Sequence, residues 1–166
     1  MSCCSNLTAL GASFKSPLEM PHFELAEFLP YQLSVASNAV SRAVATGTGY
    51  ETRFGLTGAE WRVLAVVTAA GNPTQADLVA ATGMDKMTIS RAVAGLATRQ
   101  LIDRGRDAGD RRTRRLGATE EGRRVHAIVA PEALKVEARL LAALSAGEAA
   151  ALRSALGRLA AACEEL

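Results

Sequence analysis

The fold of this chain is decided by residues 74–91, which read TQADLVAATGMDKMTISR. The first half carries apolar residues at helical spacing, and the TGMD segment at 82–85 breaks that pattern. A second helix is expected to begin near Lys86. Two short helices joined by a glycine turn form a helix-turn-helix, in which the second helix enters the major groove of DNA.

The second helix is expected to have an apolar side and a polar side. Its apolar residues should pack on the preceding helix; they are Ile89, Ala92, Val93 and Leu96. The polar residues of its first turns are candidates for base or phosphate contacts; they are Lys86, Thr88, Ser90 and Arg91. Taken singly, each polar residue is typical of a solvated helix surface. Only their combination with the turn and the following segment favours DNA contact.

That following segment predicts a charged β-hairpin, or wing. Two short strands, near 101–106 and 113–118, are separated by a tip rich in glycine and arginine. A guanidinium at such a tip can enter a narrow minor groove, which we expect of Arg111 and Arg112. Asp110 is close enough in sequence to hold Arg112 by a bidentate pair. A solvated charged loop is the alternative for these residues.

The local charge agrees with a nucleic-acid partner. Residues 85–124 hold eleven Lys or Arg against six acidic residues, a balance of +5, whereas the whole chain carries +2. A basic patch on a nearly neutral protein is typical of nucleic-acid binding. Apolar residues make up 49% of the chain and aromatic residues only 4%, which favours closely packed helices over a β-sandwich. The expected fold class is therefore mainly α with a small β-wing.

Working outward, three helix starts share one pattern, a hydroxyl residue followed three positions later by an acid. The pairs are Thr57 with Glu60, Thr74 with Asp77, and Ser145 with Glu148. In such a capping box the two side chains satisfy the free backbone N–H groups of the first turn. We therefore expect helices to begin directly after Thr57, Thr74 and Ser145.

The two ends of the chain predict helices that a DNA-binding lobe alone does not need. Residues 1–26 show no sustained period and predict an irregular arm. Residues 27–48 then predict a helix that Gly47 and Gly49 bring to an end. Its apolar residues form one stripe at helical spacing; they are Leu29, Leu33, Ala36, Val40 and Val44. After the lobe at 55–119, residues 120–166 predict further helices, with Pro131 expected to kink or interrupt the first.

The terminal helices suggest a two-fold homodimer. Their apolar stripes need a partner surface, most simply a second copy of the chain. A two-fold dimer would place two recognition helices about 34 Å apart, one turn of duplex, and would match a pseudo-palindromic site in double-stranded DNA.

Several other classes of function find little support. Cys3, Cys4 and Cys163 form no secreted disulfide framework, and His22 and His126 lack neighbours at metal-ligand spacing. No phosphate-binding loop or catalytic constellation is present, so neither an enzyme nor a cofactor is expected. Nothing resembles a secretory leader or an apolar membrane span, and a cytoplasmic protein is the expectation.

The chain resembles the MarR family of dimeric winged-helix transcription regulators over about residues 28–166. The likeness rests on residues 61–64 (WRVL), 85–91 (DKMTISR), 100–102 (QLI), 110–112 (DRR) and 116–122 (LGATEEG). Gln100 departs from the glycine frequent in the family, and Gly117 with Ala118 replaces bulkier strand residues. The resemblance implies that Arg112 enters the minor groove and that Asp110 orients it.

The resemblance also implies a repressor that a small-molecule effector releases from its operator. Tyr31 and Trp61 are candidates to line the effector cleft, although Trp61 also suits the core. A thiol-based redox signal is an alternative, but the first helix contains no cysteine. A winged helix that binds protein or RNA is a further alternative, and it predicts weak duplex binding.

Overall fold

The structure is a computed structural model that describes residues 23–106 and 114–165, in two compact units, 1–36 and 37–166. In the first unit, a 3-10 helix, η1 (Leu25–Glu27), precedes the start of α1 (Leu29–Thr48). Most of the irregular arm expected over 1–26 lies outside the described residues.

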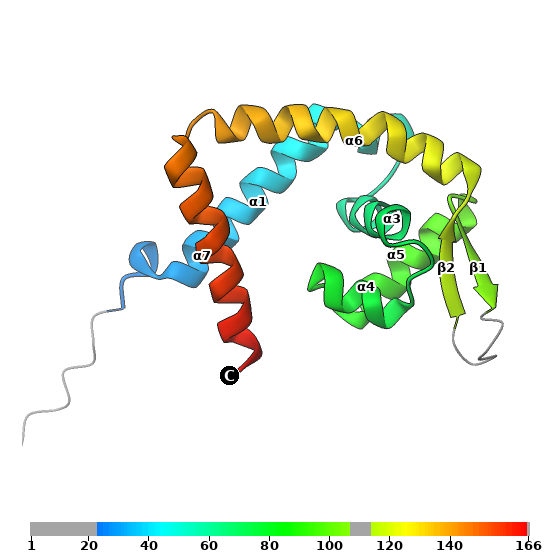
Figure 1. The fold of residues 1–166 in the computed structure, drawn as a ribbon, viewed down its shortest axis with the longest axis horizontal. Coiled ribbons are helices and arrows are strands. Elements are labelled where there is room, and N and C mark those ends of the chain that lie inside the picture. Colours follow the sequence, from blue (N-terminus) through cyan, green and yellow to red (C-terminus); the bar gives the residue numbers. More distant parts are fainter. Residues whose placement is uncertain (1–22, 107–113, 166) are drawn as a thin grey trace, which may run out of the picture. The chain divides into compact units, whose positions relative to one another are not determined.

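The second unit is mainly helical and contains an antiparallel pair of strands (Figure 1). After α1 the elements are α2 (Tyr50–Phe54), α3 (Gly58–Ala70), α4 (Gln75–Thr82), α5 (Lys86–Thr98), β1 (Ile102–Arg106), β2 (Arg114–Ala118), α6 (Glu120–Leu141) and α7 (Ala146–Glu164). Ile102 pairs with Ala118 at one end of the hairpin, and Arg106 pairs with Arg114 at the other. The predicted fold class, mainly α with a small β-wing, is confirmed.

Local sequence sets the three helix starts as predicted. Thr57, Thr74 and Ser145 are the N-caps of α3, α4 and α7, and each forms a complete capping box. In each box the N-cap hydroxyl accepts the backbone N–H three residues on, at 3.2–3.3 Å. The acid in turn accepts the N-cap N–H, so two free donors of the first turn are satisfied.

The core of the second unit lies between α3, α4, α5, the hairpin and the first half of α6. Its fully buried side chains include Leu64, Val67, Leu78, Ile89, Val93, Leu96, Leu116, Val125 and Val129. The expected apolar side of α5 is confirmed, because all four of its predicted inner residues are buried. This burial fixes which side of α5 faces away from the protein.

Helix α6 corrects the prediction for Pro131. The helix was expected to kink or to be interrupted there; it is not interrupted, because it runs from Glu120 to Leu141 with the proline inside it (Figure 1). Proline removes one N–H donor and crowds the preceding turn. Val129 and Val136 are buried on either side of it, so packing holds both halves of the helix.

Helix α2 was not predicted. It has only five residues, and Gly49 and Gly55 bound it with φ values of 64° and 62°. Gly47 and Gly49 were interpreted as the stop of the first helix. Gly47 lies inside α1, which ends at Thr48, and the left-handed Gly49 separates α1 from the additional turn of α2. Tyr50, at its start, is 3% exposed and joins the core.

The junction between α5, the hairpin and α6 is closely packed. Helix α5 ends in a Schellman motif, in which Leu101 N–H donates to Leu96 O and Gln100 N–H donates to Ala97 O. Gln100 has a φ of 57°, the single positive value outside glycine among the described residues. The Thr119 hydroxyl, at the N-cap of α6, donates to Gln100 O at 2.7 Å and thereby ties the two helices together.

The apolar stripes of the terminal helices are exposed. In α1 the stripe residues Leu29, Leu33 and Val40 are 49%, 36% and 45% exposed. In α7 no described residue is buried, and the exposed apolar side chains include Leu152, Leu156 and Leu159. Cys163, expected on this apolar side, is a free and exposed cysteine.

Candidate nucleic-acid interface

The N-terminus of α5 is held by Asp85. Its Oδ1 accepts the Thr88 N–H at 2.9 Å, and its Oδ2 accepts the Thr88 hydroxyl at 2.6 Å. These hydrogen bonds from the Thr88 side chain and backbone lower the pKa of Asp85 below its ordinary value. The carboxylate is therefore ionised at neutral pH and fixes the first turn, from which the candidate DNA contacts project.

The four predicted polar residues of α5 occupy different parts of its outer surface. Lys86, Ser90 and Arg91 are exposed, whereas Thr88 is half-buried. Thr88 and Arg91 border a hollow of about 340 Å³ against the start of α3, together with Thr57, Ala59 and Glu60. Lys86 and Ser90 lie one turn apart on the other side. The exposed surface of α5 thus has Lys86 and Ser90 on one side and Arg91 on the other.

Glu60 joins α3 to the far end of α5. The side chain is 6% exposed, and its Oε2 accepts Arg99 Nη1 at 3.0 Å as well as the Thr57 N–H at 2.8 Å. Burial raises the pKa of Glu60, but the hydrogen bonds from Thr57 and Arg99 and the charge of Arg99 outweigh it. The net pKa lies below the ordinary value, and the ionised carboxylate holds α5 against α3.

Gly95 allows this close approach. A Cβ built at Gly95 would collide with the carboxylate of Glu60, so a larger residue here would displace that carboxylate from its place beside Arg99. Helix α5 is therefore held at its N-terminus by Asp85 and at its C-terminal end by Glu60.

The hairpin is attached to the loop before α4. The Leu116 N–H donates to Pro73 O at 2.9 Å, and Arg115 Nη1 donates to Asn72 O at 3.2 Å. The predicted tip residues Asp110, Arg111 and Arg112 lie outside the described residues. The described strands end at Arg106 and Arg114, and the predicted tip follows directly from them.

Trp61 borders a small hollow on the inner side of α1. The hollow has a volume of about 230 Å³ and is lined by Val40, Ser41, Val44, Tyr50, Gly58, Trp61 and Arg62. The indole of Trp61 stacks between the Tyr50 ring, at 6.1 Å between centroids, and the His126 ring, at 5.6 Å. Arg62 Nη2 donates to Ser41 Oγ at 3.0 Å. The hollow combines an aromatic wall with a guanidinium group.

Tyr50 and Tyr31 differ in their relation to this hollow. Tyr50 is buried, and its pKa is raised by burial and by the Glu51 charge, against the opposing charge of Arg62. Its hydroxyl therefore stays protonated and can donate a hydrogen bond. Tyr31, the other predicted ligand contact, belongs to the first compact unit and is 44% exposed.

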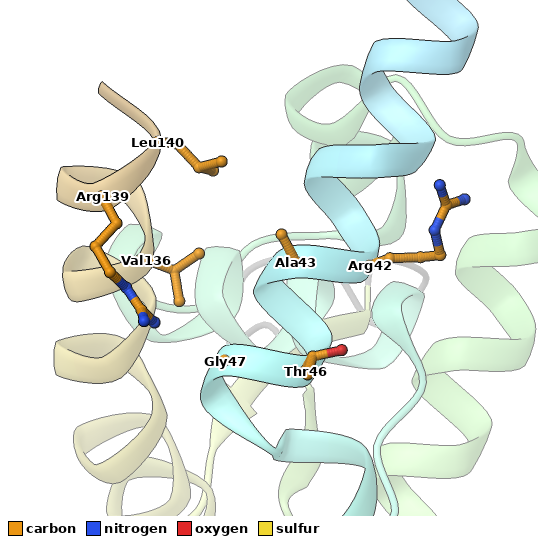
Figure 2. Close-up of a pocket in the computed structure, with 7 residues that line it drawn as sticks. All are labelled: Arg42, Ala43, Thr46, Gly47, Val136, Arg139 and Leu140. Atoms are coloured by element: carbon orange, nitrogen blue, oxygen red, sulfur yellow. The ribbon is translucent and has the colours of Figure 1, made fainter. Parts of the chain in front are cut away.

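A second, more open hollow lies between α1 and α6 (Figure 2). It has a volume of about 710 Å³ and is lined by Arg42, Ala43, Thr46, Gly47, Val136, Arg139 and Leu140. Figure 2 shows Ala43 and Gly47 of α1 across from Val136 of α6, with the Arg42 side chain directed away from α6. Because the two arginines do not converge, the hollow lacks a focused site for an anion.

The sequence left two features of this region unnoticed. Met87, in the first turn of α5, is 62% exposed, which its residue type did not suggest. Glu60 was identified only as a cap, and its pairing with Arg99 joins residues 39 positions apart. The exposure of Met87 could have been found from helical spacing, since it falls one turn before Ser90 and Arg91.

Metal and membrane sites can be examined only within the described ranges. In residues 23–106 and 114–165, no three His, Cys, Asp or Glu side chains gather where they could hold a metal ion. Over the same residues, none of the helices combines the length and the apolar character needed to cross a membrane.

Comparison with known proteins identifies the family. The MarR family model matches residues 54–113. The HTH-type transcriptional repressor NicR of Pseudomonas putida is 32% identical over 97 residues, and this match spans 58% of the chain but only 61% of NicR. The crystal structure of the PcaV transcriptional regulator from Streptomyces coelicolor, in complex with its natural ligand, is 28% identical with a TM-score of 0.75. That likeness covers 87% of this chain and 99% of PcaV.

A third relative supports the fold. A MarR/EmrR family transcriptional regulator from Acinetobacter sp. ADP1 is 23% identical with a TM-score of 0.78, covering 87% of this chain and 100% of the other. Together with the helix pair and hairpin described above, these matches agree with the likeness found in the sequence. Residues 54–113 belong to the MarR family of transcription regulators, and the likeness in fold extends over 87% of the chain.

Proposed function

We propose that this protein represses transcription by binding a pseudo-palindromic operator as a homodimer, and that a small molecule releases it. The observation that carries the proposal is that α5 has two different sides. Its apolar side is buried, whereas Lys86, Ser90 and Arg91 are exposed. A helix presented in this way fits the major groove with its first turns toward the bases. The similar protein NicR is a transcriptional repressor, which supports repression rather than activation.

The proposed DNA contacts come from two elements. Lys86, Thr88, Ser90 and Arg91 of α5 would contact base edges and phosphates. Asp110, Arg111 and Arg112 of the wing would contact the minor groove and its phosphates. Asp85 engages the Thr88 hydroxyl as a donor, so this oxygen is left to accept a hydrogen bond, for example from a base amino group. We therefore expect Arg91 to contribute more to base preference than Thr88.

The proposed dimer is built from the two ends of the chain. Residues 27–48 and 120–166 would supply the contacts between the subunits, and residues 55–119 would form the DNA-binding lobe. The exposed stripes of α1 and α7 support this arrangement, since rows of leucine gain free energy when they leave water.

The hollow beside Trp61 is the proposed effector site. Its aromatic wall suits a planar molecule, and Arg62 suits an acidic group on that molecule. The structure of PcaV with its natural ligand supports a small-molecule signal. Tyr31, in the first unit, is the second proposed ligand contact.

The decisive experiment is a titration of the duplex DNA that flanks the protein's own gene. Binding should weaken steeply as salt rises, because arginine and lysine displace counterions from the phosphates. Arg91→Ala should relax base preference at one position by about 1–3 kcal/mol, and Arg112→Ala should weaken binding to every sequence. Arg53→Ala removes a cation from α2, outside the proposed interface, and should leave both properties unchanged.

The same titration tests the release step. Adding small aromatic acids should dissociate the complex, whereas release by peroxide would favour a thiol signal. If the protein does not bind the flanking duplex at low salt, the proposed repressor function is wrong. If it binds but no ligand or oxidant releases it, only the release step is wrong.

A further inference from the structure

Met87 is a large apolar residue that is exposed at the start of α5. Its side chain is 62% exposed. Among the described residues between 41 and 133, no other large hydrophobic side chain is exposed; those that are exposed lie at 23–40 and 134–159. The other large apolar side chains of the lobe are buried or half-buried, so the exposure of Met87 sets it apart from them.

The position of Met87 on α5 is tightly defined. Asp85 caps the helix two residues earlier, and the buried Ile89 fixes the opposite side of the same turn. Ser90 and Arg91 follow at three and four residues, the spacing of neighbours on one helix surface. Met87 therefore lies between Ser90 and Arg91 on the exposed surface of α5, opposite its buried side.

The major groove offers one apolar group to such a side chain. Of the four bases only thymine carries a methyl group there, at C5, while the other edges present hydrogen-bond donors and acceptors. The methionine side chain is unbranched and polarizable and can adapt to an apolar contact. Beside an arginine that can pair with guanine, Met87 would provide the apolar half of a mixed recognition surface.

We propose that Met87 is a specificity-determining residue that contacts the C5-methyl group of a thymine in each operator half-site. The contact lies within one or two base pairs of the base that Arg91 reads, because the two side chains are helix neighbours about 5–6 Å apart. The inference rests on the proposed function, since it needs the α5 surface to enter the major groove. If Met87 were exposed without contacting DNA, removing a thymine methyl group would not change the affinity through this residue.

The test removes the methyl group from the DNA alone. A preferred duplex is first selected with the full-length protein from a random pool, and each thymine is then replaced in turn by uracil, which lacks only the methyl group. For the native protein, one replacement per half-site should lower affinity roughly fourfold, the equivalent of one buried methyl group. The symmetric double replacement should lower affinity by roughly fifteenfold.

Variants of the protein assign the effect to Met87. Met87→Ala should bind the thymine duplex less tightly and should no longer distinguish it from the uracil duplex. Met87→Leu keeps an apolar side chain and should retain the discrimination. Thr98→Ala, an exposed residue at the far end of the same helix, should behave like the native protein. Unchanged thermal unfolding of Met87→Ala establishes that its fold is intact.

The outcomes separate this inference from the function on which it rests. Equal binding of thymine and uracil duplexes by the native protein overturns the methyl contact but leaves the DNA-binding function standing. Equal sensitivity in the native protein and in Met87→Ala assigns the methyl contact to another residue and also overturns it. A selected site without a preferred A·T pair in either half also overturns the methyl contact. Failure to bind any duplex overturns both proposals.

Discussion

Glu60 is a carboxylate placed almost out of reach of water at the contact of α3 and α5. Because the folded state holds its pKa below the ordinary value of 4.5, the ionised form stabilises the fold. That stabilisation is fully present above pH 4.5 and is lost as the pH falls through the lower pKa of the folded state. We expect Glu60→Gln to lower the free energy of unfolding by about 1–3 kcal/mol at pH 7.

Urea unfolding of the native protein and Glu60→Gln at several pH values checks this prediction. The difference between the two should narrow as the pH falls below about 4, because protonation makes native Glu60 resemble glutamine. Glu132→Gln serves as a control, since Glu132 pairs with Lys135 on the exposed surface of α6. It should leave unfolding unchanged. A pH-independent difference between native protein and Glu60→Gln would contradict the ionised role.

Gln100 adopts a backbone conformation that suits glycine better. Its φ of 57° lies at the end of α5, where a left-handed residue closes the Schellman motif. Gln100→Gly relieves roughly 1–2 kcal/mol of backbone strain but adds freedom to the unfolded chain. The net effect should be a stabilisation of about 0.5–1 kcal/mol, measurable as a higher Tm.

A matched change with the opposite sign controls for this effect. Gly83, at the C-cap of α4, has a φ of 64°, and a Cβ there would meet nothing within 4 Å. Gly83→Ala should therefore destabilise by about 1 kcal/mol through the backbone alone. If Gln100→Gly lowers the Tm, the glutamine side chain makes a contact worth more than the strain.

At the level of single residues, the sequence could predict exposure but not distant pairing. The exposure of Ser90 and Arg91 follows from helical spacing, because the apolar residues of this helix recur on its other side. The ion pair of Glu60 with Arg99 does not follow, since 39 residues separate the partners and both also suit ordinary surface positions. Its discovery required the packing of one helix on another.

At the scale of elements, Gly122 determines how α6 leaves the hairpin. A Cβ built at Gly122 would collide with the backbone carbonyl of Leu101, which cannot move without disturbing β1. We expect Gly122→Ala to destabilise the protein by about 1–3 kcal/mol, even though alanine favours helices. Differential scanning calorimetry should show the loss.

Gly157 in α7 provides the comparison. A Cβ at this exposed position meets nothing within 4 Å, so Gly157→Ala should stabilise by about 0.5–1 kcal/mol. A neutral result for Gly122→Ala would indicate that the start of α6 can shift away from Leu101 at little cost.

Helix starts could be predicted from the sequence better than helix continuity. Capping boxes act within four residues, so Thr57, Thr74 and Ser145 were correctly identified as N-caps. The passage of α6 through Pro131 depends instead on buried contacts of distant residues. The single turn of α2 is too short to show any hydrophobic period.

For the whole molecule, the exposed stripe of α7 carries the next prediction. Leu156 is 46% exposed in the described structure and lies on the proposed dimer surface. We expect Leu156→Glu to yield folded monomers, because a charge cannot be buried there without a partner. Sedimentation velocity should show the lower mass, and operator affinity should fall because the two half-sites are no longer bound together.

Ser154→Glu introduces the same charge on the opposite side of α7 and should remain dimeric. A dimeric Leu156→Glu with native operator affinity would contradict the assignment of α7 to the interface. The sequence predicted that these stripes need a partner, but the arrangement of two subunits depends on contacts that one chain does not contain.

Because α6 is continuous, a movement at one of its ends is transmitted to the other. Twenty-two residues at about 1.5 Å per residue span roughly 33 Å, from Thr119 beside the end of α5 to the start of the turn into α7. A tilt of about 5° at one end of a rod of that length moves the other by roughly 3 Å, comparable to the step between neighbouring base pairs. A small rearrangement near Leu141 would therefore be enough to move α5 out of register with its proposed DNA site.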